Sequence, residues 1–92
     1  SQGRVWQEIF RILKPGGRFV VSDIYAIDKV ADTYRTNPEY ISECWAGAET
    51  RQDYMKNIAH AGFTRTEVLE ESMPYEKGLI KVASFTVKGN KP

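Results

Sequence analysis

The sequence has 92 residues, of which 41% are hydrophobic and 27% charged, proportions typical of a folded domain rather than a disordered chain. Thirteen Lys and Arg residues against twelve Asp and Glu residues give a net charge of +1, which argues against nucleic acid or a membrane surface as partner. The single cysteine, Cys44, excludes an intrachain disulfide and no apolar run reaches the roughly 18 residues of a membrane helix, so we expect a cytoplasmic protein.

The first quarter of the sequence predicts a helix, a turn and a strand. Apolar residues recur at helical spacing over residues 5–13, and the K-P-G-G stretch at 14–17 ends that helix. The R-F-V-V-S stretch at 18–22 predicts a short strand, and its apolar centre favours burial on both faces, as in parallel sheets. This order is half of a βαβ unit, so we expect the chain to have been cut from a larger fold.

The rest of the sequence predicts a long excursion followed by a helix and two strands. Residues 24–48 have no clean period and predict a lid or substrate-binding insertion, with a short helix beginning at Asn37-Pro38. Thr50 and Asp53 predict the start of a further helix, which ends at Gly62. Residues 64–71 and 79–87 predict strands joined by a short connection, hence antiparallel neighbours, and residues 88–92 predict a tail.

Longer stretches of this sequence resemble a known family. The stretch V-W-Q-E-I-F-R-I-L-K-P-G-G-R-F-V-V-S-D resembles the helix–turn–strand segment of class I S-adenosylmethionine-dependent methyltransferases. The stretches S-D-I-Y-A, R-T-N-P-E-Y-I-S-E-C-W-A-G-A and A-G-F are closest to the arsenite methyltransferase branch. The resemblance covers nearly the whole chain but only the C-terminal half of the family's domain.

The resemblance implies an α/β fold over residues 1–92 as a single partial domain. We expect the C-terminal half of a Rossmann-like sheet, with one parallel-type strand, a terminal antiparallel β-hairpin and helices packed on the sheet. The strand at 79–87 should lie between the strands at 18–22 and 64–71. The family's glycine-rich cofactor motif and acidic ribose-binding residue are absent, so the resemblance implies that S-adenosyl-L-methionine is bound mainly upstream of residue 1.

Four residues are candidates for contact with a substrate. Cys44 falls on the cysteine of the family's G-C-I-A-G-A pattern, and the alternative is a small buried apolar residue. Asp23 lies at the carboxyl end of the first strand, where ligands bind in open α/β sheets, and the alternative is a turn residue. Tyr25 and Trp45 are candidates for lining a pocket or for ordinary packing. We expect no catalytic acid or base and no metal site.

The resemblance implies transfer of a methyl group to trivalent arsenic bound by cysteine thiolates, and a soft centre of this kind needs several thiolates. Cys44 alone is insufficient, so its partners would lie outside this chain. Two alternatives stay open: a methyltransferase for a quinone or lipid precursor, and a methyltransferase-like module that only binds. We expect a small-molecule partner and self-association through an exposed sheet edge. Glu67, Glu70 and Glu71 are expected to be solvated.

Overall fold

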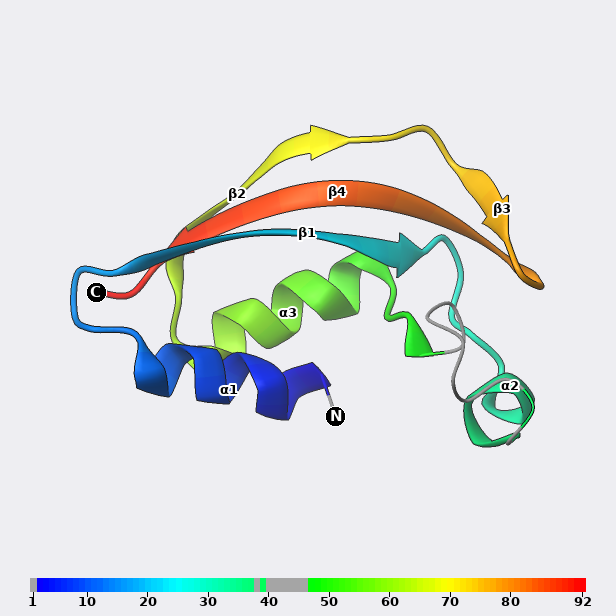
Figure 1. Cartoon of the computed structure of the whole chain (residues 1–92), viewed down its shortest axis with the longest axis horizontal. Coiled ribbons are helices and arrows are strands. Elements are labelled where there is room, and N and C mark those ends of the chain that lie inside the picture. Colours follow the sequence, from blue (N-terminus) through cyan, green and yellow to red (C-terminus); the bar gives the residue numbers. More distant parts are fainter. Residues whose placement is uncertain (1, 38, 40–46) are drawn as a thin grey trace.

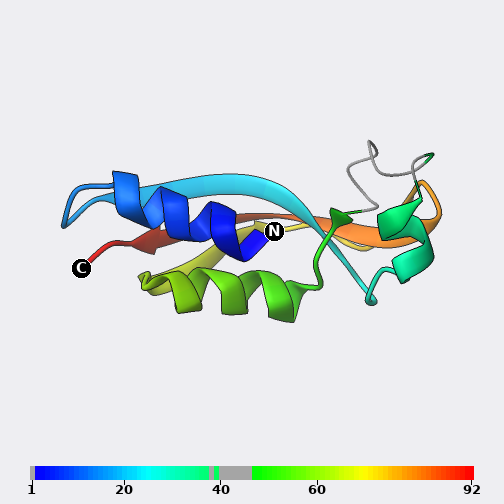
Figure 2. The ribbon, with the colours of Figure 1, turned by 90° about the horizontal axis from the view of Figure 1, so that it is seen from below.

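A curved antiparallel sheet, with two helices packed on one of its faces, organises the chain in the computed structural model (Figure 1). The structure describes residues 2–37, 39 and 47–92. Figure 2, viewed from the helix side, shows α1 (Gln2–Ile12) and α3 (Arg51–Ala61) lying over the same face. A short helix, α2 (Asp32–Thr36), lies at the far end of the molecule (Figure 1).

Among the described residues, four strands form the sheet: β1 (Arg18–Ala26), β2 (Thr64–Glu71), β3 (Tyr75–Lys77) and β4 (Ile80–Asn90). The strand order is β1-β4-β2, with β3 pairing the first residues of β4. The prediction that the last strand lies between the other two is therefore confirmed. Because β1 and β2 are both antiparallel to β4, they run in the same direction, and their carboxyl ends lie at the same end of the sheet.

The helix α3 begins and ends where the sequence predicts. The hydroxyl of Thr50 accepts a hydrogen bond from the backbone N–H of Asp53 at 3.2 Å, which satisfies one of the free donors of the first turn. Gly62 ends the helix with a φ of +112°, in the left-handed region that favours glycine. These two caps fix the length of α3 and with it the position of its first turn relative to the sheet.

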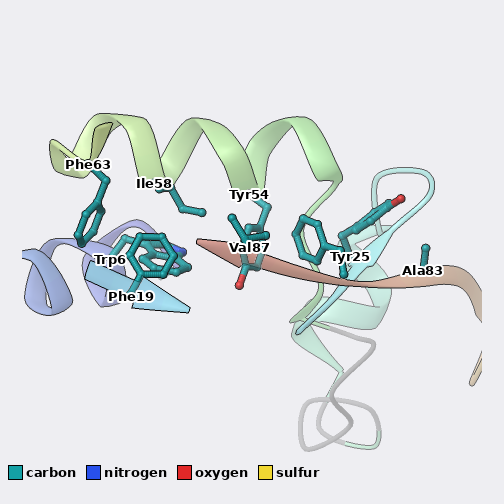
Figure 3. Close-up of a cluster of buried hydrophobic side chains, with 9 residues drawn as sticks. Trp6, Phe19, Tyr25, Tyr54, Ile58, Phe63, Ala83 and Val87 are labelled. Carbon is teal, nitrogen blue, oxygen red and sulfur yellow. The ribbon is translucent and has the colours of Figure 1, made fainter. Parts of the chain in front are cut away.

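A core rich in aromatic rings fills the space between the helices and the sheet. Trp6 of α1 is 3% exposed, and its ring centroid lies 4.9 Å from that of Phe19 and 6.1 Å from that of Phe63. Tyr54 and Ile58 point from α3 toward the sheet (Figure 3). The tilted and edge-on ring contacts specify one arrangement more strongly than aliphatic packing does. The buried members of this core are Trp6, Phe19, Tyr25, Tyr54, Ile58, Phe63, Ala83, Phe85 and Val87.

Two predictions about β1 are wrong. The strand continues through Ile24, Tyr25 and Ala26, so the excursion begins at Ile27 rather than at residue 24. The strand is also buried on one face only, since Val20 is 59% exposed while its neighbour Phe19 is buried. The cause is that α1 and α3 both lie on the same face of the sheet (Figure 2).

Two further expectations about chain segments differ from the structure. Residues 88–92 are not a tail: β4 continues to Asn90, and the ammonium of Lys91 binds the carbonyls of Phe10 and Leu13 at 2.7 and 2.8 Å. The connection at 72–78 contains the short strand β3. The helix expected after Asn37-Pro38 falls on residues 38 and 40–46, which lie outside the described part of the chain.

Candidate functional site

The carboxyl ends of β1 and β2 meet the first turn of α3 in a cluster of polar side chains. Phe85 of β4 pairs with Asp23 of β1 on one side and with Glu71 of β2 on the other. Its ring lies 4.8 Å from the ring of Tyr25 and 4.8 Å from that of Tyr54, both edge-on at 68°. Phe85 therefore separates two hydrogen-bonded groups, one around each carboxylate.

The first group orients the carboxylate of Asp23. Its Oδ2 accepts a hydrogen bond from the Tyr54 hydroxyl at 3.0 Å, and its Oδ1 accepts one from the backbone N–H of Ile24 at 2.8 Å. Burial raises the pKa of the Tyr54 phenol, and the negative charge of Asp23 raises it further. The hydroxyl thus stays protonated and remains a donor, while Asp23 itself is exposed to solvent. The result is an accessible carboxylate in a fixed orientation.

The second group connects Tyr25, Glu71 and Arg51. The Tyr25 hydroxyl donates to Glu71 Oε2 at 2.5 Å, and Arg51 Nε donates to the same oxygen at 2.8 Å. The hydrogen bond from Arg51, followed by that from Tyr25, lowers the pKa of Glu71. Desolvation, together with Glu71, raises the pKa of Tyr25, a residue that is 8% exposed. Glu71 is exposed to solvent, as expected, and it is also bound by two partners, which the sequence did not predict.

A second, smaller core lies beyond this cluster, where the excursion leaves and rejoins the sheet. Ala26, Val30 and Ala48 are its buried residues. The Arg35 guanidinium of α2 donates from Nη2 to the carbonyl of Ala48 at 2.8 Å. The backbone N–H of Ala26 donates to the carbonyl of Glu49 at 2.8 Å. These contacts place the end of the excursion beside the carboxyl end of β1.

The four predicted site residues divide into two pairs. Asp23 and Tyr25 lie at alternate positions of β1, and both reach the helix side of the sheet, where they bind different partners. Cys44 and Trp45 lie outside the described residues, so their contact with a substrate stays a prediction. Ala48, the last residue of the C-W-A-G-A stretch, is described and is buried next to Ala26.

Sequence reasoning missed three residues of the cluster: Tyr54, Glu71 and Arg51. Each makes its contact with a residue at least 20 positions away, so local spacing carries no signal for it. The strand polarity of β1 and the capped start of α3 were the available signals, since together they place the first turn of α3 at this end of the sheet.

None of the helices in the described ranges is long and apolar enough to cross a membrane. The same part of the chain contains no group of three or more His, Cys, Asp or Glu residues placed to hold a metal ion.

The opposite face of the sheet carries an open groove with a different character. Four hydroxyl residues, Ser22, Ser72, Ser84 and Thr86, line it together with Asp23, Glu71 and Phe85 of the cluster. The hydroxyls already have partners: Ser22 Oγ lies 2.8 Å from Thr86 Oγ1, and Ser84 Oγ lies 2.6 Å from the hydroxyl of nearby Tyr75. Satisfied hydroxyls on an uncovered sheet face are the ordinary pattern of a solvated surface. The oriented carboxylates and tyrosines therefore mark the helix side as the better candidate.

Parts of this chain are similar in sequence to a protein family and to two curated relatives. Residues 1–62 match the family described as a methyltransferase domain. An arsenite methyltransferase from Halobacterium salinarum is 34% identical over 65 residues, which are 71% of this chain and 17% of that protein. An arsenite methyltransferase from Aquipseudomonas alcaligenes is 36% identical over 67 residues, which are 73% of this chain and 19% of that protein.

A solved structure shares the same architecture. The crystal structure of an arsenic(III) S-adenosylmethionine methyltransferase from Chlamydomonas reinhardtii matches with a TM-score of 0.76 and 28% identity, over 94% of this chain and 31% of that one. This chain thus spans about a third of the solved structure and less than a fifth of the two curated relatives. The expected fold, part of a class I methyltransferase sheet, is confirmed. The chain belongs to the methyltransferase domain family.

Proposed function

We propose that this chain forms the methyl-acceptor side of the active site of an S-adenosylmethionine-dependent methyltransferase. The observation that supports this most is the exposed, oriented carboxylate of Asp23 at the carboxyl end of β1, beside Tyr25. Ligands of open α/β sheets bind outside the carboxyl ends of the strands. The fold match to an arsenic(III) methyltransferase over 94% of the chain supports the reaction class.

The cofactor is held by protein outside these residues in this proposal. A dinucleotide-type or nucleoside site uses a glycine-rich loop that leaves a strand and enters a helix. The Gly16-Gly17 pair of this chain does the reverse, since it leaves α1 and enters β1. The residues present therefore do not fit the adenosyl part of S-adenosylmethionine, and we assign to them only the binding and orientation of the acceptor.

Trivalent arsenic, bound by Cys44 and by thiolates outside this chain, is the acceptor that we propose. Two arsenite methyltransferases are similar to this chain over about seven-tenths of its length. Cys44 falls within a stretch that resembles the arsenite methyltransferase branch. Arsenic(III) is a soft centre that prefers thiolate ligands. Direct displacement of a methyl group requires alignment more than proton transfer. The cluster suits this requirement, because its carboxylates are engaged in hydrogen bonds that fix their geometry.

The test is the Cys44→Ser substitution in the complete methyltransferase that contains this chain, assayed with arsenite and with quinone and lipid-precursor acceptors. We expect arsenite methylation to be lost while S-adenosylmethionine affinity, measured by titration calorimetry, is unchanged. Normal arsenite methylation by the variant would refute the role of Cys44. Activity of the wild type on a quinone or lipid precursor, and not on arsenite, would support the alternative acceptor. Cofactor binding without any turnover would support a binding module.

A further inference from the structure

The end of the excursion, residues 48–51, is attached to the sheet by few backbone contacts. The N–H of Ala26 donates to the carbonyl of Glu49 at 2.8 Å, and Ala26 and Thr50 form an isolated parallel bridge. A single bridge is weak compared with the ladders of the sheet, where β1 pairs with β4 over nine consecutive residues. Side chains must therefore supply much of what keeps this segment beside β1.

One carboxylate joins the two sides of that bridge. Tyr25 directly precedes Ala26, and Arg51 directly follows Thr50. Both side chains donate to Oε2 of Glu71, Tyr25 at 2.5 Å and Arg51 at 2.8 Å, and a second Arg51 nitrogen lies 3.5 Å from Oε1. Glu71 reaches them from β2, on the other side of β4. We call these three residues the Glu71 clasp.

The clasp also influences the carboxylate on the other side of Phe85. Arg51 and Tyr54 lie three residues apart in the first turn of α3, so a contact that fixes Arg51 restrains the backbone that carries Tyr54. Tyr54 in turn holds Asp23. Glu71 is thus connected directly to Tyr25 and Arg51, and through the first turn of α3 to Tyr54 and Asp23.

We propose that Glu71 is a positioning residue, which holds residues 48–51 and the first turn of α3 against the carboxyl end of β1 and thereby orients Asp23. The importance of this orientation for methyl transfer rests on the proposed function. Glu71 suits the task because its carboxylate accepts from two donors, and one of them, Tyr25, is buried.

Glu67 provides a matched control on the same strand. Its carboxylate pairs with the ammonium of Lys88 at 3.3 Å, and the two side chains are 61% and 42% exposed. That ion pair joins β2 to β4 at a position where the two strands already pair through the ladder. Glu67→Gln therefore removes a comparable charge from the same strand without releasing a segment that the backbone leaves weakly attached.

The experiment compares amide hydrogen exchange in the 92-residue chain, its Glu71→Gln variant and its Glu67→Gln variant. We expect Glu71→Gln to speed exchange of the Ala26 amide about tenfold, because the hydrogen bond to Glu49 opens locally. The adjacent Ile27 amide, which donates to the carbonyl of Lys81 at 3.0 Å, should change less than twofold. Glu67→Gln should leave both amides unchanged.

Two outcomes would overturn the proposal. An unchanged exchange rate of the Ala26 amide would mean that Glu71 does not hold the segment, and equal acceleration of all amides would make Glu71 a general stabiliser of the fold.

A second experiment measures kinetics in the complete methyltransferase. Glu71→Gln should raise the KM for the acceptor about fivefold and leave cofactor affinity unchanged; an unchanged KM refutes the positioning role. Failure of the proposed function is distinguishable, since a wild-type protein without methyltransferase activity would leave the exchange results intact.

Discussion

Lys91 provides a sharp test of how the end of the chain stabilises the fold. Its ammonium donates to the carbonyls of Phe10 and Leu13, at the end of α1, and lies 4.5 Å from the centroid of the Phe10 ring. The last carbonyls of a helix have no partner within the helix, and a cation there also interacts favourably with the helix dipole. Lys91→Met keeps the aliphatic stem of the side chain and removes all three interactions.

The expected cost follows from these contacts. A hydrogen bond from a charged donor contributes about 1.5 kcal/mol or more when buried, and a cation–π contact about 0.5 kcal/mol at an exposed site. Lys91 is only partly buried, and water can solvate the freed carbonyls, so we expect a total loss of about 2 kcal/mol. With a urea m-value of about 1 kcal/mol/M for a chain of this size, the unfolding midpoint should fall by about 2 M.

The assay is urea unfolding of the 92-residue chain followed by far-UV circular dichroism, with Lys88→Met as the control. Lys88 makes an exposed ion pair with Glu67, so its substitution should cost only about 0.5 kcal/mol. Both variants lose one positive charge, which cancels any effect of net charge. A midpoint for Lys91→Met no lower than that for Lys88→Met would refute the reasoning, and residues 91–92 would then be dispensable for stability.

Three further predictions follow from the structure. Gly89→Ala should destabilise the chain by about 1–3 kcal/mol in the same assay, because the added Cβ would lie 2.5 Å from Cε2 of Phe19, and Phe19→Leu should partly restore stability in the double variant. The pKa of Tyr54 is raised in the folded chain, so the unfolded phenol ionises first and the free energy of unfolding should fall as the pH rises above about 10. Tyr54→Phe should make this fall less steep, by up to about 1.4 kcal/mol per pH unit. Equal slopes of unfolding free energy against pH in the wild type and the variant would contradict the prediction. The outer edge of β1 should promote self-association that Val20→Lys weakens, and a monomer at all concentrations in light scattering would rule this out.

Much of the fold could be predicted because its signals are local. The caps of α3 depend on Thr50 and Gly62, which lie at the ends of the helix that they define. The bounds of β2 follow from turn residues on either side, and its place beside β4 follows from the short connection. The extension of β1 to Ala26 was missed because Asp23, Ile24 and Tyr25 show no simple alternation.

The candidate site was only half predictable. Asp23 and Tyr25 follow from the polarity of β1, which places them at the end of the sheet where ligands bind. Their partners depend on which residue of β2 reaches the same position, and β2 contains register irregularities on both sides of its Glu67-Val68 pair. A shift of one residue moves a side chain to the other face of a sheet. Whether Glu70 or Glu71 faces the helices therefore requires the three-dimensional structure.

The placement of β4 has a consequence for how the chain folds as it is synthesised. β4 follows β1 and β2 in the sequence, yet it lies between them, and contacts such as that of Ser22 with Thr86 span 64 residues. At a synthesis rate of about 5–20 residues per second, roughly 3 to 13 s separate the appearance of β1 from that of its partner. During this interval β1 lacks β4, its partner strand among the described residues. Pairing of β1 with β4, and of β2 with β4, is therefore expected to wait until the end of this segment has been synthesised.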